Sequence, residues 1–235
     1  MGQRRVIPSV IVFALAWVVL AAGGPGLMST TAGDAVPWGA GQFATVASMW
    51  IVMMVAMMLP TVAPWVAALS TIGRRMGRGL PAGEFVAGYL LVWSGFSVAA
   101  ASVQWGLHEA GWLSAASSLG PQAAGGLLIV AGVYQWTPAK QACLKHCRSP
   151  LGFFLTSWRS GRWGPARMGL RHGAFCVACC WALMALSFVA GVMNLIWMAL
   201  VALFVLVDHA VARGPWLGRA AGAALAVWGV GLVAS

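Results

Sequence analysis

The sequence predicts an all-α fold, a polytopic bundle of transmembrane helices, and three observations support this. Hydrophobic residues make up 61% of the 235 residues and charged residues only 8%, against about 45–50% and about 25% in an average soluble domain. So few charges cannot cover a water-soluble surface, so most of the exterior must face an apolar medium. Seven apolar stretches each approach the ~20 residues that a helix needs to cross the hydrocarbon of a bilayer. We expect a single integral membrane domain over residues 1–235.

The expected spans follow one another along the chain. They cover residues 6–24, 43–69, 85–106, 122–139, 173–190, 193–211 and 215–234. The first resembles a secretory signal, but it leads straight into further spans without a convincing cleavage site, so we expect a retained anchor. Pro60 and Pro64 interrupt the second span, which favours either irregular backbone that lines a cavity or a kink that only shapes packing. Residues 140–172 mix aromatic residues with arginines, which favours a short helix in the interface plane or an aromatic belt.

The basic residues predict the topology, because Lys and Arg collect in loops that stay in the cytoplasm. Of the 14, twelve precede the first span or lie in the connections after the second and fourth spans, and Arg213 and Arg219 flank the last turn. The connections around residues 25–42, 107–121 and 191–192 contain none. With seven spans, the N-terminus is cytoplasmic and the C-terminus is outside, in the cytoplasmic (inner) membrane of a bacterium. We interpret the net charge of +10 as a signal for topology and lipid headgroups, and no nucleic-acid motif accompanies it.

The five cysteines form two clusters. Cys143 and Cys147 lie in CLKHC, and CVACCW contains Cys176, Cys179 and Cys180. Spacings of three and four residues place side chains on one face of a helix, so each cluster can present two thiols together. The expected topology puts both clusters near the cytoplasmic side, where they can meet. Cysteines there are kept reduced, which leaves metal ligation and redox exchange as the open chemistries.

The neighbouring methionines favour copper over zinc. The second span contains Met53, Met54, Met57 and Met58, which form two pairs four residues apart. Soft thiolate and thioether ligands select Cu(I), whereas closed tetrahedral thiolate sites favour zinc. The alternative for these methionines is adaptable packing in an apolar core.

Two histidines are further candidate ligands. His146 lies inside CLKHC, and His172 lies four residues before Cys176 on the same helical face. Each is a metal ligand or an interfacial polar residue.

Charged residues near the clusters have two interpretations each. Asp208 lies in the sixth span beside His209, within reach of Arg171 or Arg213. It is either a salt-bridge anchor or a group of the site, because a carboxylate at this depth is costly. Lys140 and Gln141 are expected to orient thiolates, or Lys140 contacts headgroups.

Three blocks together resemble the bacterial family described as predicted metal-binding integral membrane proteins, formerly a domain of unknown function. They are W-x-x-MM-x-x-MM-x-P at Trp50 to Pro60, YQWTPAKQACLKHCRSP at Tyr134 to Pro150, and CVACCWALMALSFVAGVMN at Cys176 to Asn194. The similarity covers residues 50–213 and implies metal binding, with copper as the favoured metal. It carries over the five cysteines and four methionines above as ligands. Members pair an acidic with a basic residue late in the sixth span; Asp208-His209 stands there, and the resemblance gives His209 no role.

These observations predict a membrane protein that takes up, holds or hands on Cu(I), and they favour this binding role over an enzymatic one. Its expected partners are the lipid bilayer and a soluble or membrane metal-delivery partner or a copper enzyme. The alternatives are a membrane thiol-disulfide oxidoreductase that exchanges electrons with a quinone, and a scaffold subunit of a membrane complex. Gly125, Gly126 and Gly132 suit helix contacts within one chain or between chains of an oligomer.

Overall fold

The computed structural model describes residues 15, 17–18, 20–22, 39–77, 80–114, 117–159, 161–192, 194–210 and 215–235. Within these ranges the regular structure is helical, with one isolated bridge between Leu113 and Leu119. Four helices are long and apolar enough to cross a membrane: Ala40–Arg75, Ala82–Glu109, Gly164–Ala190 and Trp216–Ala234. The all-α prediction is therefore confirmed, whereas the count of seven spans stays a prediction.

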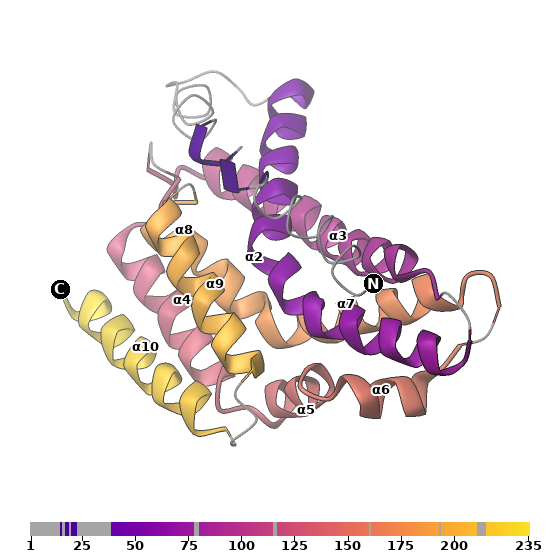
Figure 1. Cartoon of the computed structure of the whole chain (residues 1–235). Coiled ribbons are helices and arrows are strands. Elements are labelled where there is room, and N and C mark those ends of the chain that lie inside the picture. The colour runs from indigo at the N-terminus through magenta and orange to yellow at the C-terminus, as the bar shows by residue number, and fades with distance from the viewer. Residues whose placement is uncertain are drawn as a thin grey trace.

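The helices follow the expected order along the chain. They are α2 (Ala40–Arg75), α3 (Ala82–Glu109), α4 (Pro121–Tyr134), α5 (Pro138–Cys147), α6 (Pro150–Ser157), α7 (Gly164–Ala185), α8 (Ser187–Ala190), α9 (Leu195–Ala210) and α10 (Trp216–Ala234). The expected span 6–24 lies mostly outside the described residues. Helices α5 and α6 follow one another along the lower side of the molecule, where α6 lies beside α2 (Figure 1).

Two expected spans have different boundaries in the structure. Helix α4 ends at Tyr134, earlier than residue 139, because Pro138 disfavours helical backbone at the residue before it. Thr137 then caps α5, its hydroxyl accepting the Lys140 amide at 3.3 Å. Helix α7 begins at Gly164 rather than residue 173. Its first turns pack closely on α3, where a Cβ at Gly169 would overlap the Phe85 carbonyl.

Helix α2 continues through both of its prolines. Pro60 has no N–H, so the carbonyl of Ala56 loses its helical donor. Trp17 Nε1 donates to that carbonyl at 3.1 Å. The freed backbone group is thus satisfied by a side chain, which supports the interpretation that Pro60 shapes packing.

Aromatic side chains surround Trp65 in the C-terminal half of α2. The Trp65 ring contacts the rings of Phe85, Phe153 and Phe154. Residues 150–157 form the short helix expected between the fourth and fifth spans, and the ring contacts show that both of its phenylalanines face the core. The opposite face presents Leu151 and Leu155, which are 62% and 83% exposed.

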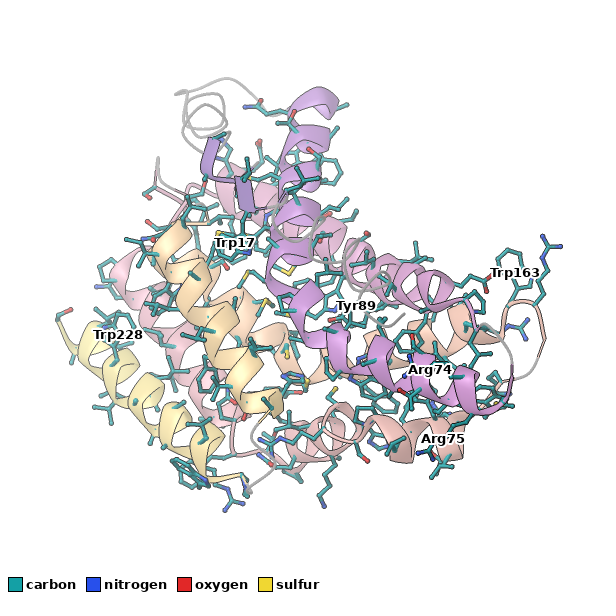
Figure 2. All side chains as sticks on the ribbon, in the orientation of Figure 1. Trp17, Arg74, Arg75, Tyr89, Trp163 and Trp228 are labelled. Carbon is teal, nitrogen blue, oxygen red and sulfur yellow. The ribbon has the colours of Figure 1, made fainter. Side chains whose placement is uncertain are left out.

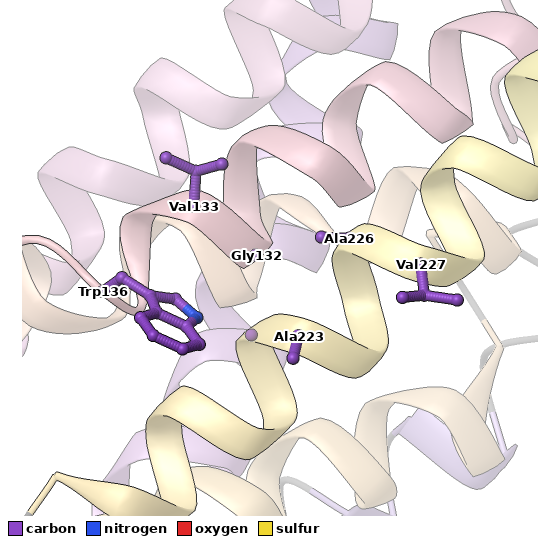
Figure 3. Close-up of a pocket in the computed structure, with 7 residues that line it drawn as sticks. Gly132, Val133, Trp136, Ala223, Ala226 and Val227 are labelled. Carbon is purple, nitrogen blue, oxygen red and sulfur yellow. The ribbon is translucent and has the colours of Figure 1, made fainter.

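Helices α4 and α10 pack through glycines. A Cβ at Gly132 would lie 2.6 Å from the carbonyl oxygen of Gly222, and one at Gly229 would lie 2.6 Å from that of Gly125. Gly125 and Gly132 therefore serve a contact within the chain, whereas a Cβ at Gly126 would meet nothing. An open apolar groove of about 360 Å³ runs along this seam (Figure 3), lined by Gly132, Val133, Trp136, Gly222, Ala223, Ala226 and Val227.

Candidate metal centre

Three helices bring together four side chains that could hold a metal ion. Cys147 is the last residue of α5, Cys176 and Cys179 lie on α7, and His209 lies on α9. One ligand atom from each lies within 4.8 Å of all the others. The three cysteines are buried and His209 is half-buried. The expected meeting of the two cysteine clusters is therefore present in the structure.

Hydrogen bonding orients the imidazole toward the thiols. His209 Nδ1 lies 2.8 Å from the Val205 carbonyl oxygen, which can only accept. A neutral ring that donates from Nδ1 keeps a free electron pair on Nε2. This Nε2 lies 3.6 Å from Cys179 Sγ, which is also 3.8 Å from Cys147 Sγ. The arrangement is that of a histidine ligand whose second nitrogen is held by a backbone carbonyl.

The other two cysteines lie next to this group and outside it. Cys180 Sγ is 3.4 Å from Cys179 Sγ. Cys143 lies one helical turn before Cys147 and is half-buried, and burial raises the pKa of its thiol. Both remain candidates for transient ligation during exchange.

The side chains of the four methionines lie in the core. The backbone carbonyl of Met58 connects their helix to the four-ligand group through Tyr89. Met53, Met54, Met57 and Met58 are all buried. Tyr89, in the interior beside α2 (Figure 2), has its hydroxyl 3.2 Å from the Met58 carbonyl oxygen and 3.4 Å from Cys176 Sγ. The same hydroxyl lies 3.0 Å from Thr61 Oγ1. The contact from the methionine helix to the thiols thus runs through a backbone carbonyl and a tyrosine.

The histidines predicted from the sequence lie outside the four-ligand group. His146 is exposed, with Nδ1 3.0 Å from the Ala142 carbonyl oxygen and its ring stacked on Phe175. His172 is buried and stacks on Trp65 with ring centroids 3.7 Å apart. Its Nδ1 has no hydrogen-bond partner among the described residues.

Asp208 is a salt-bridge anchor, but with partners other than those expected. Its carboxylate lies 3.2 Å from Lys140 Nζ and 3.2 Å from Arg148 Nη2. The expectation of Arg171 is wrong, because that residue lies on α7 with its guanidinium over the Phe175 ring. Arg213 lies outside the described residues.

Sequence reasoning missed His209 as a ligand. The histidine is separated by 29 residues from the nearest cysteine, so no spacing motif includes it. One signal was present: His209 lies at the end of the sixth expected span, at the depth expected for both cysteine clusters.

The fold and the site place the chain in a class of protein: apolar helical proteins in which several thiols and an imidazole lie close enough together to hold a metal ion. The PpoB2 family model, described as a copper chaperone, matches residues 47–232. The chain therefore belongs to this copper chaperone family, which confirms the resemblance seen in its sequence blocks. No curated protein and no solved structure matches the chain.

Proposed function

We propose that this protein is an integral membrane chaperone that holds one Cu(I) between Cys147, Cys176, Cys179 and His209 and passes it to or from a partner. The convergence of these four ligand atoms from three helices carries the proposal. Three thiols and one imidazole are also a set found in structural zinc sites. Membership of a copper chaperone family and the preference of thiolates for Cu(I) favour copper.

Four long apolar helices support the membrane location. The basic residues that predict topology gather at one end of the bundle. Arg74 and Arg75 end α2, which contacts α6. Arg148 binds the end of α9, and Arg219 at the start of α10 lies over the Trp136 ring. We propose that this end, with α5 and α6, faces the bacterial cytoplasm.

Helix α5 is the proposed exchange face. Its buried side ends in Cys147, whereas Cys143 is half-buried and His146 is exposed. A shallow groove of about 230 Å³ opens beside His146, between α5 and α6. A partner that docks there reaches Cys143 and His146 before the buried thiols. Ligand exchange along α5 then moves the ion without releasing it into water.

Deeper in the bundle, the thioethers of Met53, Met54, Met57 and Met58 and the thiol of Cys180 are proposed as weaker ligands. All five side chains are buried in the core, and Cys180 Sγ lies 3.4 Å from Cys179 Sγ. His172 is proposed to assist from its aromatic surroundings, with its unpartnered Nδ1. Such soft ligands retain Cu(I) in an apolar interior during transfer.

Metal analysis of purified protein tests the proposal. Protein extracted in mild detergent without chelator is expected to carry about one copper per chain, measured by mass spectrometry with zinc in parallel. Cys176→Ser with Cys179→Ser, and His209→Ala alone, should lower the copper content. Cys143→Ser is the matched control, because it removes an exchange thiol and leaves the four ligands; it should keep copper and slow its transfer to a chelator. Full copper content in the double variant, or zinc in place of copper, would contradict the assignment.

The separation of 3.8 Å between Cys147 Sγ and Cys179 Sγ favours a second candidate function, reversible disulfide formation. Oxidation of the two thiols releases two protons and two electrons to an acceptor such as a quinone. Counting free thiols in the same preparation separates the two functions. Metal-free protein with an oxidised Cys147–Cys179 pair would favour redox exchange.

A further inference from the structure

Three buried charged side chains lie beside the metal centre without belonging to its four ligands. Lys140 and Arg148 both contact the carboxylate of Asp208 at 3.2 Å. The side chains are 1%, 14% and 3% exposed, respectively. Burying charges is costly, and a buried ion pair is weak evidence for stability by itself. We therefore expect this network of charges to have a role other than stabilising the fold.

Each end of the Arg148–Asp208 pair is a sequence neighbour of a ligand. Arg148 follows Cys147, and Asp208 precedes His209. The guanidinium also donates to the backbone carbonyl of Asp208, at 2.9 Å from Nε and 2.7 Å from Nη2. These bonds join the end of α5 to the end of α9. A planar guanidinium suits this double contact because its donors form a rigid fork.

The two halves of the metal centre differ in how they are held. Cys176 and Cys179 lie on one helix, α7, so its regular backbone sets their separation. Cys147 and His209 come from two short helices, α5 and α9. Their position relative to each other depends on contacts between those helices, and the Arg148–Asp208 bonds are such a contact.

Lys140 holds the same carboxylate from the other side. Its ammonium contacts Asp208 Oδ2 and donates to Gln135 Oε1, in the turn between α4 and α5. The amide of Lys140 is capped by Thr137. The carboxylate is therefore bound by Lys140 of α5, seven residues before Cys147, and by Arg148, which follows Cys147 directly at the end of that helix.

We propose that Arg148, Asp208 and Lys140 are positioning residues that hold Cys147 and His209 against the two thiols of α7. The proposal rests on the proposed function of the four-ligand group. Without the carboxylate, α7 keeps its pair of thiols, while the nitrogen ligand and the thiol of α5 lose their alignment. Removal of groups that orient metal ligands typically weakens metal binding by about 10- to 100-fold.

Asp208→Asn, His209→Ala and the double variant form the decisive set. Cu(I) affinity is measured by competition with bicinchoninate in detergent, and copper K-edge X-ray absorption counts nitrogen and sulfur ligands. We expect Asp208→Asn to bind Cu(I) about 10- to 100-fold more weakly, with the two sulfur ligands of α7 retained and the nitrogen ligand lost. Because the carboxylate acts partly through His209, the losses of the two single variants should not add in the double variant.

Glu109→Gln is the matched control. This exposed carboxylate ends α3 and accepts from Trp105 Nε1 at 3.2 Å, so its loss should leave Cu(I) affinity unchanged. If Asp208→Asn does not fold, Arg148→Lys is the second variant. It keeps the charge but cannot make both bonds to the Asp208 carbonyl, so the same loss of the nitrogen ligand is expected. Wild-type affinity with the nitrogen retained, or additive losses, would overturn the positioning role. Failure of wild-type protein to bind Cu(I) would instead overturn the proposed function.

Discussion

At the scale of single residues, the centre depends on polar groups that hold sulfur and nitrogen in place within an apolar protein. Tyr89 is the clearest case, because its hydroxyl lies 3.4 Å from Cys176 Sγ and contacts Met58 and Thr61 of α2. The Met58 carbonyl oxygen accepts the single proton of this hydroxyl in the structure; when Cys176 is a thiolate, which can only accept, the hydroxyl can donate to its sulfur instead, and such a charge-assisted hydrogen bond stabilises the thiolate. One side chain of α3 therefore connects the proline-containing helix to the thiols of α7.

Tyr89→Phe tests this role. Loss of the hydroxyl removes a bond to the Cys176 thiolate, so Cu(I) affinity should fall by about tenfold, and stability should fall by about 1 kcal/mol. Competition with bicinchoninate and thermal unfolding measure the two effects. Tyr134→Phe is the control, since Tyr134 donates to the Ala178 carbonyl and to no thiol. It should lower stability and leave affinity unchanged; equal losses of affinity would refute a specific role for Tyr89.

At the scale of helices, glycines decide which pairs pack closely. Gly132 and Gly222 let the backbones of α4 and α10 approach, as Gly88 and Gly169 do for α3 and α7. In an apolar medium helices gain little from burying apolar surface, so close packing of small residues supplies the attraction. None of the four ligands lies on α4 or α10, and we expect this pair to support the bundle without taking part in ligation.

Gly222→Ala should therefore destabilise the protein. Its Cβ would lie 2.7 Å from the Gly132 carbonyl oxygen, a backbone atom that cannot move aside, and overpacking of this kind costs about 1–3 kcal/mol. Gly231→Ala on the same helix is the control, because a Cβ there meets nothing within 4 Å; the higher helix propensity of alanine should keep or raise its stability. Thermal unfolding in detergent, with copper content in parallel, measures both. Equal melting temperatures for the two variants would disprove tight α4–α10 packing.

At the scale of the whole molecule, the four-ligand group includes the last residue of α5, in the segment 140–172 that carries seven of the 14 Lys and Arg residues. Helices α5 and α6 lie along the lower side of the molecule (Figure 1); α6 contacts α2, and Arg148 at the end of α5 binds the Asp208 carbonyl of α9. Since basic loops stay in the cytoplasm, copper is expected to be exchanged on the cytoplasmic side.

Reporter fusions test this orientation. Alkaline phosphatase, active only outside the cytoplasm, should be active after Glu109 and Ser235 and inactive after Ser157, whereas a cytoplasmic fluorescent reporter should give the reverse pattern. The reason is that residues 140–172 carry seven Lys and Arg and the connection around residues 107–121 carries none. Phosphatase activity after Ser157 would invert the topology and place copper exchange outside the cytoplasm.

The sequence by itself determined the all-helical class, the family and the sulfur chemistry, because composition, apolar length and motif spacing are local properties of a chain. Helical spacing was enough to place Cys176 on one face with Cys179 or Cys180. It was not enough to select Cys147 over Cys143, or to include His209 and separate it from His146 and His172. Those choices depend on how α5 and α9 are placed against α7. The bonds of Arg148 and Lys140 to Asp208 join α5 to α9. Contacts between residues far apart in the chain leave no periodic pattern in it, so only the tertiary structure decided which side chains form the centre.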